Sequence, residues 1–395
     1  MKTVDDFNYN NQKVLVRVDF NVPLDEKYNV TDNTRIVMAK PTIEKILKDG
    51  GSVILMSHLG RPKGPDEKFS LKHIIPEVEK VLGKRIIFSP EIIGPEVKKK
   101  AGSIKKGEVM LLENLRFDPR EKKGDVAFAR ELAALADAYV NDAFGTAHRA
   151  HASTTVVARF FPGKKAAGYL LANEVKNIKK ALEEGEHPIT AIIGGAKVSS
   201  KLGVIKNLMD KVDNLIIVGG MAYTFLKALG KQTGKSLVED DLIDEAKNLM
   251  KYAKEKGVDL VLPVDFIVAD DFSPGANTKI VDADHIPEEW MGLDIGPETI
   301  NLLDKVIKQS KTIIWNGPAG VFEWDAFSKG TRSIAQSIAE ATNQGAFSLV
   351  GGGDSVAAVK KYGLQDKISY ISTGGGAMLE MLEGKDLPAI KALED

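Results

Sequence analysis

Short apolar runs rich in β-branched residues alternate with amphipathic stretches along the whole chain. The first half has such runs at 14–18, 53–56, 85–88, 109–112 and 138–140, and the second half at 189–193, 215–218, 260–263, 312–315, 347–350 and 368–371. Between the runs, apolar residues recur at helical spacing, for example at Val175, Ile178 and Leu182. Strands that alternate with helices predict an α/β fold of parallel sheets covered on both faces.

So many strands exceed what one open sheet commonly holds, and 395 residues exceed one compact core. We therefore expect two Rossmann-like domains, residues 1–170 and 171–376. The boundary falls near 160–175, where a loop, Phe161-Pro162-Gly163-Lys164, leads into a strand. A polar helix from about Asn173 follows and is expected to join the domains as a helical hinge.

Composition narrows the class without identifying a function. The formal net charge of −1 gives no whole-molecule attraction to nucleic acid or to an anionic membrane. The chain has no cysteine, which excludes disulfides, thiolate nucleophiles and cysteine-ligated metals. No apolar run approaches the roughly 20 residues that span a bilayer, and the N-terminus lacks the apolar core of a secretion signal. These features favour a cytoplasmic enzyme.

The basic residues are distributed unevenly. Nine of the ten arginines and four of the six histidines lie in the first 160 residues, whereas the second half is basic through lysine. The guanidinium fork suits carboxylates and phosphates, so this asymmetry predicts an anion-binding surface on the N-terminal half; drift in arginine and lysine usage is the alternative.

Ligands of open α/β sheets bind beyond the carboxyl ends of the strands. In the second half glycine follows the strands, at 194–195, 219–220, 317, 351–353 and 374–376. Glycine lets backbone N–H groups approach an anion, and although each turn alone is equally typical of a tight loop, five together predict a phosphate-rich ligand. In the first half polar side chains follow the strands instead, at 17–21, 57–61, 113–116, 141–142 and 148–151.

Several motifs have competing interpretations. The segment 230–236 is similar to a Walker A loop but has Leu229 in place of its first glycine, and no complete G-x-G-x-x-G occurs. His148 and His151 could face a metal, but no third ligand is in view. Lys197 and Lys201 lie four apart, which predicts either a phosphate clamp on one helix face or a solvated lysine face. The pair Asp354-Ser355 could cap a helix or reach Mg²⁺.

Together these stretches resemble phosphoglycerate kinases over nearly the whole chain. The resemblance is carried by RVDFNVP from Arg17, HLGRP from His58, LLENLRF from Leu111, VNDAFGTAHRAH from Val140, GGAKVSSK from Gly194, GGMAYTF from Gly219, GLDIGPET from Gly292, WNGPAGVFE from Trp315, GGGDS from Gly351 and STGGGA from Ser372. The chain departs from the family pattern at Val218, Ala319 and Met378, of which the first two bear on packing of the adenine pocket.

The resemblance implies reversible phosphoryl transfer between Mg·ATP and 3-phosphoglycerate, giving ADP and 1,3-bisphosphoglycerate, in a monomer. The implied phosphoglycerate ligands are Asp19, Asn21, Arg35, His58, Arg61, Arg116 and Arg149. The implied nucleotide ligands are Lys201, Gly219, Gly292, Glu323, Gly352, Gly353, Asp354 and Ser355, with Asp354 on Mg²⁺. Arg35, Lys197, Gly353 and Gly376 would stabilise the phosphoryl group in flight, and the tail 377–395 would return to the first domain.

The implied chemistry agrees with the residues present. A carboxylate acceptor is already ionised at neutral pH, so no general base is required, and domain closure must bring the two substrates together. Another acyl-phosphate-forming phosphotransferase or ATP-dependent ligase is the alternative enzyme, and acceptor specificity separates the two. A non-catalytic nucleotide-binding scaffold is the alternative of a different class; the presence of Lys197, Asp354 and the arginines argues against it.

Overall fold

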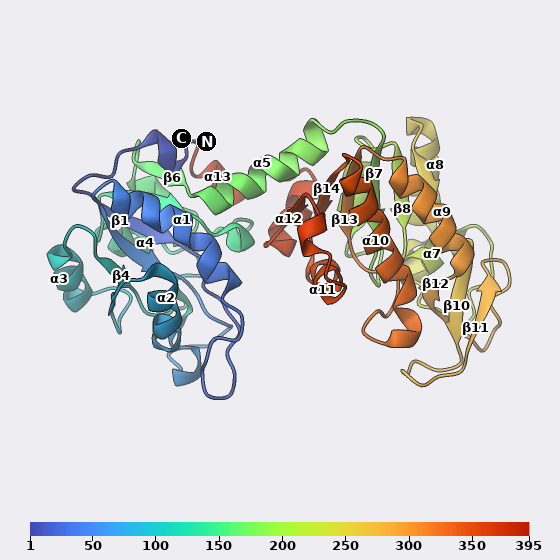
Figure 1. The fold of residues 1–395 in the computed structure, drawn as a ribbon, viewed down its shortest axis with the longest axis horizontal. Helices are drawn as coiled ribbons and strands as arrows, with labels where there is room; N and C mark the ends of the chain where they lie inside the picture. Colours follow the sequence, from blue (N-terminus) through green and yellow to red (C-terminus); the bar gives the residue numbers. More distant parts are fainter. Residues whose placement is uncertain (395) are drawn as a thin grey trace. The chain divides into compact units, whose positions relative to one another are not determined.

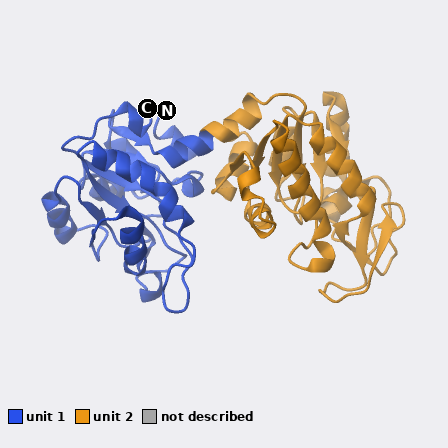
Figure 2. Cartoon of the chain, viewed as in Figure 1, with its two compact units in different colours: residues 1–175, 386–395 blue, residues 176–385 orange. Residues whose placement is uncertain are grey.

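The computed structural model describes residues 1–394, which form two compact units (Figure 2). The first unit comprises Met1–Val175 and the chain from Asp386 onward, and the second comprises Lys176–Lys385. The chain passes from one to the other within helix α5, Tyr169–Glu183. This helix begins four residues before the Asn173 expected from the sequence, because its apolar first turn conceals the start from a reading of polar periodicity.

The first unit is built on a six-stranded parallel sheet in the order β3-β4-β2-β1-β5-β6. Its strands are β1 (Lys13–Arg17), β2 (Ser52–Met56), β3 (Ile86–Phe88), β4 (Val109–Leu111), β5 (Ala138–Asn141) and β6 (Lys165–Ala167). Its helices are α1 (Thr34–Lys48), α2 (Ile75–Leu82), α3 (Pro95–Ser103), α4 (Val126–Ala133) and α13 (Pro388–Lys391). All five strands predicted in this half are confirmed, with ends that differ by a residue or so.

Burial explains why these runs form central strands. Every residue of β2 and β4 is buried, so both faces of the sheet are covered. Alternate residues such as Val14, Val16, Val53 and Leu55 pack with helix residues such as Ile43 into one core. Leu15 and Ile54, which alternate with these residues and face the opposite side, are also buried.

The second unit repeats the architecture with a parallel sheet in the order β15-β14-β13-β7-β8-β9. Its strands are β7 (Ile189–Ile193), β8 (Asn214–Ile217), β9 (Asp259–Val261), β13 (Thr312–Asn316), β14 (Phe347–Val350) and β15 (Tyr370–Ile371). Its helices are α6 (Leu202–Leu208), α7 (Ala222–Ala228), α8 (Ile243–Lys256), α9 (Pro297–Lys308), α10 (Lys329–Asn343), α11 (Gly353–Lys361) and α12 (Gly375–Leu382). The predicted strands are again confirmed, and α9 and α10 lie side by side (Figure 1).

The second unit has a second sheet, which is antiparallel in the order β11-β10-β12, and the sequence pattern did not predict it. It consists of β10 (Asp265–Ala269), β11 (Thr278–Asp282) and β12 (Met291–Ile295). The edge strand β11 is largely exposed and carries no buried apolar run, which removes the signal that identified the other strands.

The return of the chain to the first unit begins later than expected. The sequence placed the tail from residue 377 with the first domain, but α12 belongs to the second unit, where it packs against α6 and Asn207 Nδ2 donates to Leu382 O at 2.8 Å. The chain rejoins the first unit at Asp386, and Ala389 N donates to Ala147 O at 3.1 Å.

Candidate functional site

The first candidate site lies at the carboxyl ends of the central strands of the first unit. Strand β1 lies between β2 and β5, and the chain order reverses there, which is where open α/β sheets bind ligands. Arg17 ends β1, His58 lies two residues beyond β2 and Asn141 ends β5. Three segments distant in sequence thus present polar side chains at one edge of the sheet.

The loop after β1 and the start of α1 together carry three of the residues that the resemblance implicates. Arg35 Nη1, from the first turn of α1, lies 3.1 Å from Asp19 Oδ1 and donates to Asn21 O at 3.0 Å. Asn21 Oδ1 in turn accepts from Gly60 N at 2.8 Å. Asp19, Asn21 and Arg35 are therefore brought together and tied to the loop after β2.

Arg116, from the segment after β4, contacts the loop after β2. Its Nη1 donates to Gly60 O at 2.9 Å, while its Nε is buried without a hydrogen-bond partner. The fully buried Asn114 sets this approach, because its side chain bonds both Leu59 N and Leu59 O and accepts from Arg116 N at 3.0 Å. The sequence did not single out Asn114; its place directly before the Leu-Arg of LLENLRF was the only available signal.

A buried polar chain lies beneath these residues and contains Arg17, which was not among the expected ligands. The Arg17 side chain is fully buried; its Nε donates to Ser153 Oγ at 2.9 Å and its Nη2 lies 3.0 Å from His58 Nδ1. Ser153 Oγ donates to Glu121 Oε2 at 2.6 Å, and Glu121 is the buried counter-charge of Arg17. Such burial makes Arg17 a supporting residue rather than a surface ligand.

The electrostatics of the cluster favour an anion. Burial, with Arg17, Arg116 and Arg35 nearby, holds the pKa of His58 well below its ordinary value. Burial and the same kind of cationic surroundings lower the pKa of His151 to about 4. Burial also lowers the pKa of Arg116, to which Arg17 and Arg61 contribute. The arginines near these groups outnumber the neighbouring carboxylates of Asp19 and Glu121, an arrangement that a bound carboxylate or phosphate relieves.

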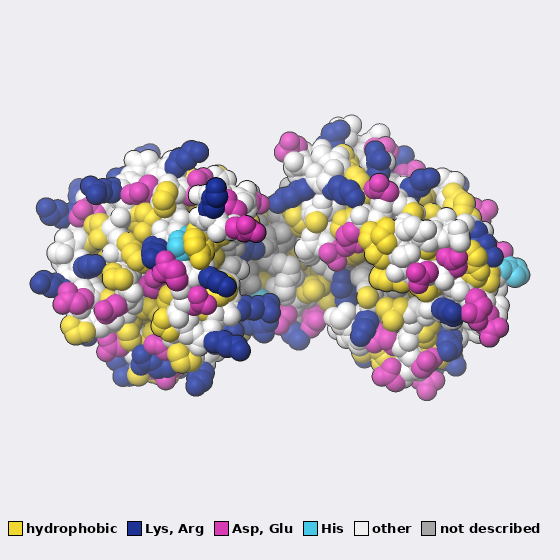
Figure 3. Space-filling view, turned by 90° about the horizontal axis from the view of Figure 1, so that it is seen from below, with side chains coloured by type: hydrophobic (Ala, Val, Ile, Leu, Met, Phe, Trp, Pro, Cys, Tyr) yellow, Lys and Arg dark blue, Asp and Glu magenta, His cyan; other side chains and the backbone are white. Residues whose placement is uncertain are grey.

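Arg61 and Arg149 complete the set at its exposed side. Arg61 contributes to the lowered pKa of Arg116, and Arg149 to that of His151, so both lie close to the cluster. Elsewhere Lys and Arg are interspersed with Asp and Glu over the visible face of both units (Figure 3). Attraction of an anion is thus a local property of the cluster rather than of the whole surface.

The second candidate site lies at the corresponding switch point of the second unit, between β7 and β13. Gly194 N donates to Asn316 O at 2.9 Å, and a β-carbon on Gly194 would lie 2.3 Å from Pro318 O, so only glycine allows this approach. Lys201 Nζ donates to Gly194 O at 2.8 Å and to Asn316 Oδ1 at 2.5 Å. Burial lowers the pKa of Lys201 to about 8, partly offset by Asp354.

Two helix N-termini lie beside Lys201. Helix α11 begins at Gly353 after Gly352, whose φ of +96° requires glycine, and α12 begins at Gly375. A β-carbon on Gly375 would lie 3.3 Å from Gly352 Cα, so the two helix starts are adjacent. Unbonded N–H groups and two adjacent helix N-termini are a ready anion site, and Gly376 lies in the first turn of α12.

The capping interpretation of Asp354-Ser355 is wrong. Gly352 precedes α11 and no side chain caps this helix. The Ser355 hydroxyl instead accepts from Gly317 N at 2.7 Å, which holds the β13 loop to α11. Asp354 is exposed in the first turn and is therefore available to a ligand.

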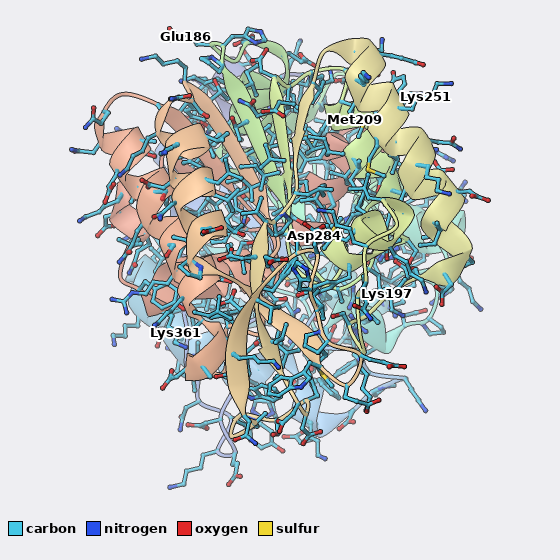
Figure 4. The ribbon with its side chains drawn as sticks, turned by 90° about the vertical axis from the view of Figure 1, so that its right-hand side faces the viewer. Glu186, Lys197, Met209, Lys251, Asp284 and Lys361 are labelled. Atoms are coloured by element: carbon cyan, nitrogen blue, oxygen red, sulfur yellow. The ribbon has the colours of Figure 1, made fainter. Side chains whose placement is uncertain are left out.

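The expectation that Lys197 and Lys201 share one helix face is also wrong. Helix α6 begins at Leu202, and Lys197 is exposed in the loop after β7. Figure 4 labels Glu186, which precedes β7, near the top and Lys197, which follows β7, in the lower half. The loop persists because Ser200 Oγ donates to Lys197 O at 2.8 Å, a local bond that competes with helix formation. The lysines still follow the same strand.

The remaining expected residues flank this site. Gly219 follows β8, and a β-carbon there would lie 2.6 Å from Gly195 O. Gly292 lies in β12, against the Tyr223 hydroxyl of α7, and Glu323 is exposed after β13. The Walker-like segment is a loop between α7 and α8, where Ser236 Oγ accepts from Gly292 N at 2.9 Å.

Within residues 1–394 the structure contains no group of three or more His, Asp or Glu side chains arranged to hold a metal ion. Asp354 alone, beside two helix N-termini, fits Mg²⁺ that arrives with phosphates, since this ion commonly uses one or two carboxylates plus phosphate oxygens and water. Over the same residues, no helix has the length and hydropathy required to cross a membrane.

Comparison with known proteins identifies relatives of this arrangement. The phosphoglycerate kinase family model matches residues 4–385. Phosphoglycerate kinase of Porphyromonas gingivalis is 52% identical, with 99% of this chain and 100% of that protein covered. Cytosolic phosphoglycerate kinase 3 of Arabidopsis thaliana is 52% identical, with 100% of this chain and 98% of that protein covered.

Solved structures agree with the sequence relatives. Phosphoglycerate kinase from Coxiella burnetii superposes with a TM-score of 0.90 at 43% identity, covering 99% of this chain and 98% of that one. The enzyme from Pyrococcus horikoshii superposes with a TM-score of 0.80 at 30% identity, covering 100% and 98%.

Proposed function

The chain belongs to the phosphoglycerate kinase family, and from that premise we propose how its two sites divide the reaction. The protein is a phosphoglycerate kinase by family: it transfers a phosphoryl group reversibly between ATP and the carboxylate of 3-phosphoglycerate. The first unit holds the phosphoglycerate, and the second holds the nucleotide. This proposal rests mainly on one contrast. The first unit has a cation cluster with few acidic partners, and the second unit has a glycine-rich pair of helix N-termini.

The phosphoglycerate binds at the cation cluster through Asp19, Asn21, Arg35, His58, Arg61, Arg116 and Arg149. Asn114 accepts from the backbone N–H of the partly buried Arg116, and Arg17 bonds the buried His58 ring, so both residues are positioned before the ligand arrives. Two anionic ends and a hydroxyl match a site that offers several guanidinium groups together with Asp19 and Asn21 as hydroxyl partners.

The nucleotide binds at the second site. Lys201 contacts its α-phosphate, Gly219, Gly292 and Glu323 line the nucleoside, and Gly352, Gly353, Asp354 and Ser355 line the phosphates. Lys201 supports this role because its ammonium is largely buried, yet it donates to two carbonyl oxygens and one amide oxygen, all of them uncharged. A phosphate therefore supplies the anion that this buried cation lacks. Asp354 would hold Mg²⁺, which neutralises charge on the phosphate oxygens when bound.

Transfer itself requires positioning and charge stabilisation. The acceptor carboxylate is already ionised, so no side chain needs to remove a proton. Arg35 and Lys197, together with backbone N–H groups at Gly353 and Gly376, stabilise the phosphoryl group in flight. Arg35 belongs to the first unit and the other three to the second.

Shared stabilisation implies closure around the connecting helix α5, and the enzyme works as a cytoplasmic monomer. Small-angle scattering tests closure: the radius of gyration falls when both substrates are bound, relative to either alone. An unchanged radius in the ternary complex would remove closure from the mechanism.

The function is tested by ADP formation from ATP and Mg²⁺ with and without 3-phosphoglycerate. ADP appears only when 3-phosphoglycerate is present, and other small carboxylates do not replace it. Equal turnover with an unrelated carboxylate would favour a different acyl-phosphate-forming enzyme, and no turnover with any acceptor would favour a binding protein.

A further inference from the structure

Beneath the cation cluster of the first unit, four side chains form a directed series of hydrogen bonds. Arg17 Nη2 lies 3.0 Å from His58 Nδ1, and Arg17 Nε donates to Ser153 Oγ at 2.9 Å. Ser153 Oγ donates onward to Glu121 Oε2 at 2.6 Å, and Ser153 N donates to Glu121 Oε1 at 2.8 Å. Arg17, Ser153 and Glu121 are fully buried, and His58 is 3% exposed. A guanidinium N–H can only donate and a carboxylate oxygen can only accept, so chemistry fixes the direction of these bonds.

The direction of these hydrogen bonds determines which ring nitrogen of His58 carries the proton. Guanidinium groups only donate, so the Arg17–His58 bond requires a lone pair on Nδ1. A neutral imidazole with a lone pair on Nδ1 carries its hydrogen on Nε2. A protonated imidazole would place an N–H against the Arg17 N–H, with the positive charges of Arg116 and Arg35 adding repulsion.

We propose that Glu121 and Ser153 are positioning residues that, through Arg17, fix His58 as a neutral imidazole that donates only from Nε2. Glu121 supplies the charge that allows Arg17 to be buried, and Ser153 orients the guanidinium edge toward His58. His58 then contributes a hydrogen bond rather than a charge to the phosphoglycerate site. This assignment rests on the proposed placing of phosphoglycerate at the cluster.

The consequence is a division of labour among the basic residues. Arg35, Arg61, Arg116 and Arg149 provide charge that does not vary with pH, and His58 provides direction. A histidine that titrated near neutrality would make phosphoglycerate affinity depend on pH, whereas the fixed tautomer keeps it constant over that range.

The primary test is the tautomer in the free, full-length enzyme. Long-range ¹H–¹⁵N spectra of histidine-labelled protein between pH 6 and 8, with His58 assigned from the spectrum of His58→Gln, show the Nε2–H form throughout. An Nδ1–H form, or a titration near pH 6.5, overturns the proposal. This readout needs no substrate, so it fails or succeeds independently of the proposed function.

The second test uses a matched pair of variants. Ser153→Ala removes the acceptor of Arg17, so His58 becomes a tautomer mixture and the KM for 3-phosphoglycerate rises by about 3- to 10-fold with the KM for ATP unchanged. Ser153→Thr keeps the hydroxyl and restores both readouts to near the parent values. Unchanged tautomer and KM in a folded Ser153→Ala protein overturn the positioning role, as does an equal loss in Ser153→Thr.

Discussion

The two units meet the same problem, the binding of an anion at a sheet's switch point, with different materials. The first unit uses side chains: Arg35, His58 and Arg116 converge from three segments on one edge of the sheet. The second unit uses backbone: two adjacent helix N-termini and glycine turns provide the donors, and the largely buried Lys201 adds a cation. One site is rich in charge and the other in oriented N–H groups.

The difference predicts different responses to change. In a site made of side chains, removing one arginine weakens ligand binding by the hydrogen bonds and charge of that arginine and leaves the backbone in place. A backbone site depends on close approach, so a methyl group at a position such as Gly194, where a β-carbon would lie 2.3 Å from Pro318 O, disturbs the loop itself. Variants that separate binding from chemistry in each unit test this difference.

The largest effect is expected at Lys197. Its exposed ammonium lies in the loop after β7 and is free to contact a ligand. We therefore expect it to stabilise the transferring phosphoryl group more than the bound nucleotide. Lys197→Ala lowers kcat by about 10²–10³-fold and leaves the KM for ATP within a few-fold. Steady-state kinetics measure both. Lys206→Ala, which removes a surface lysine paired with Glu245 at 3.0 Å, is the control and retains activity. A raised KM with kcat intact at Lys197 would reverse the roles of Lys197 and Lys201.

At Arg116 the expected loss is in substrate binding. Arg116→Ala removes a charged donor at a partly buried site, so the KM for 3-phosphoglycerate rises by about 10- to 100-fold. Arg116→Lys restores only part of the loss because an ammonium lacks the fork. Arg120→Ala is the matched control, since the Arg120 guanidinium already pairs with Asp118 at 2.7 Å. Full rescue by lysine would show that charge alone is read.

Asp354 separates a metal role from a structural one. Because no side chain caps α11, Asp354→Asn leaves the melting temperature unchanged. It weakens Mg²⁺ binding to the ADP complex by about 10-fold, since one charged ligand is lost. Calorimetric titration of Mg²⁺ into the ADP complex measures this, with ADP binding in the absence of Mg²⁺ as the control. Full Mg²⁺ affinity in the Asn variant would assign the ion to phosphates alone.

The smallest expected effect is proton uptake at Lys201. Burial lowers its folded pKa to about 8, so near pH 8 the free enzyme holds this lysine roughly half protonated. A bound phosphate favours the ammonium and raises the pKa, so nucleotide binding takes up roughly half a proton at pH 8 and none at pH 6, where the lysine is already charged. Calorimetry in buffers of different ionisation enthalpy measures the uptake. Uptake that persists in Lys201→Met would come from another group.

The sequence predicted the two parallel sheets because their central strands are apolar runs that are buried in the fold. Runs such as 189–193 are buried over their whole length, and these gave both six-stranded sheets. The antiparallel sheet was not predicted: its edge strand β11 is exposed and carries no core signal, although β10 and β12 are mostly buried. The start of α6 was misplaced because Ser200 bonds the backbone locally, a choice that spacing alone does not reveal.

The candidate site was predictable at its surface and not beneath it. Residues such as Arg116 can be identified from the sequence because they follow a strand within a charged motif. Ser153 and Glu121 do not, since their role arises from a fold that brings positions 32 residues apart into one hydrogen bond. Asn114 is similar, because its contact with Leu59 spans 55 residues.

The central claim is that the two units bind different substrates, and a crossed calorimetric measurement tests it most directly. Dissociation constants for 3-phosphoglycerate and for ADP are measured separately on Arg116→Ala and on Lys201→Ala. Arg116→Ala loses affinity for 3-phosphoglycerate alone, and Lys201→Ala loses affinity for ADP alone, because Arg116 and Lys201 belong to different units. Equal loss of both ligands in either variant would contradict the division of the reaction between the units.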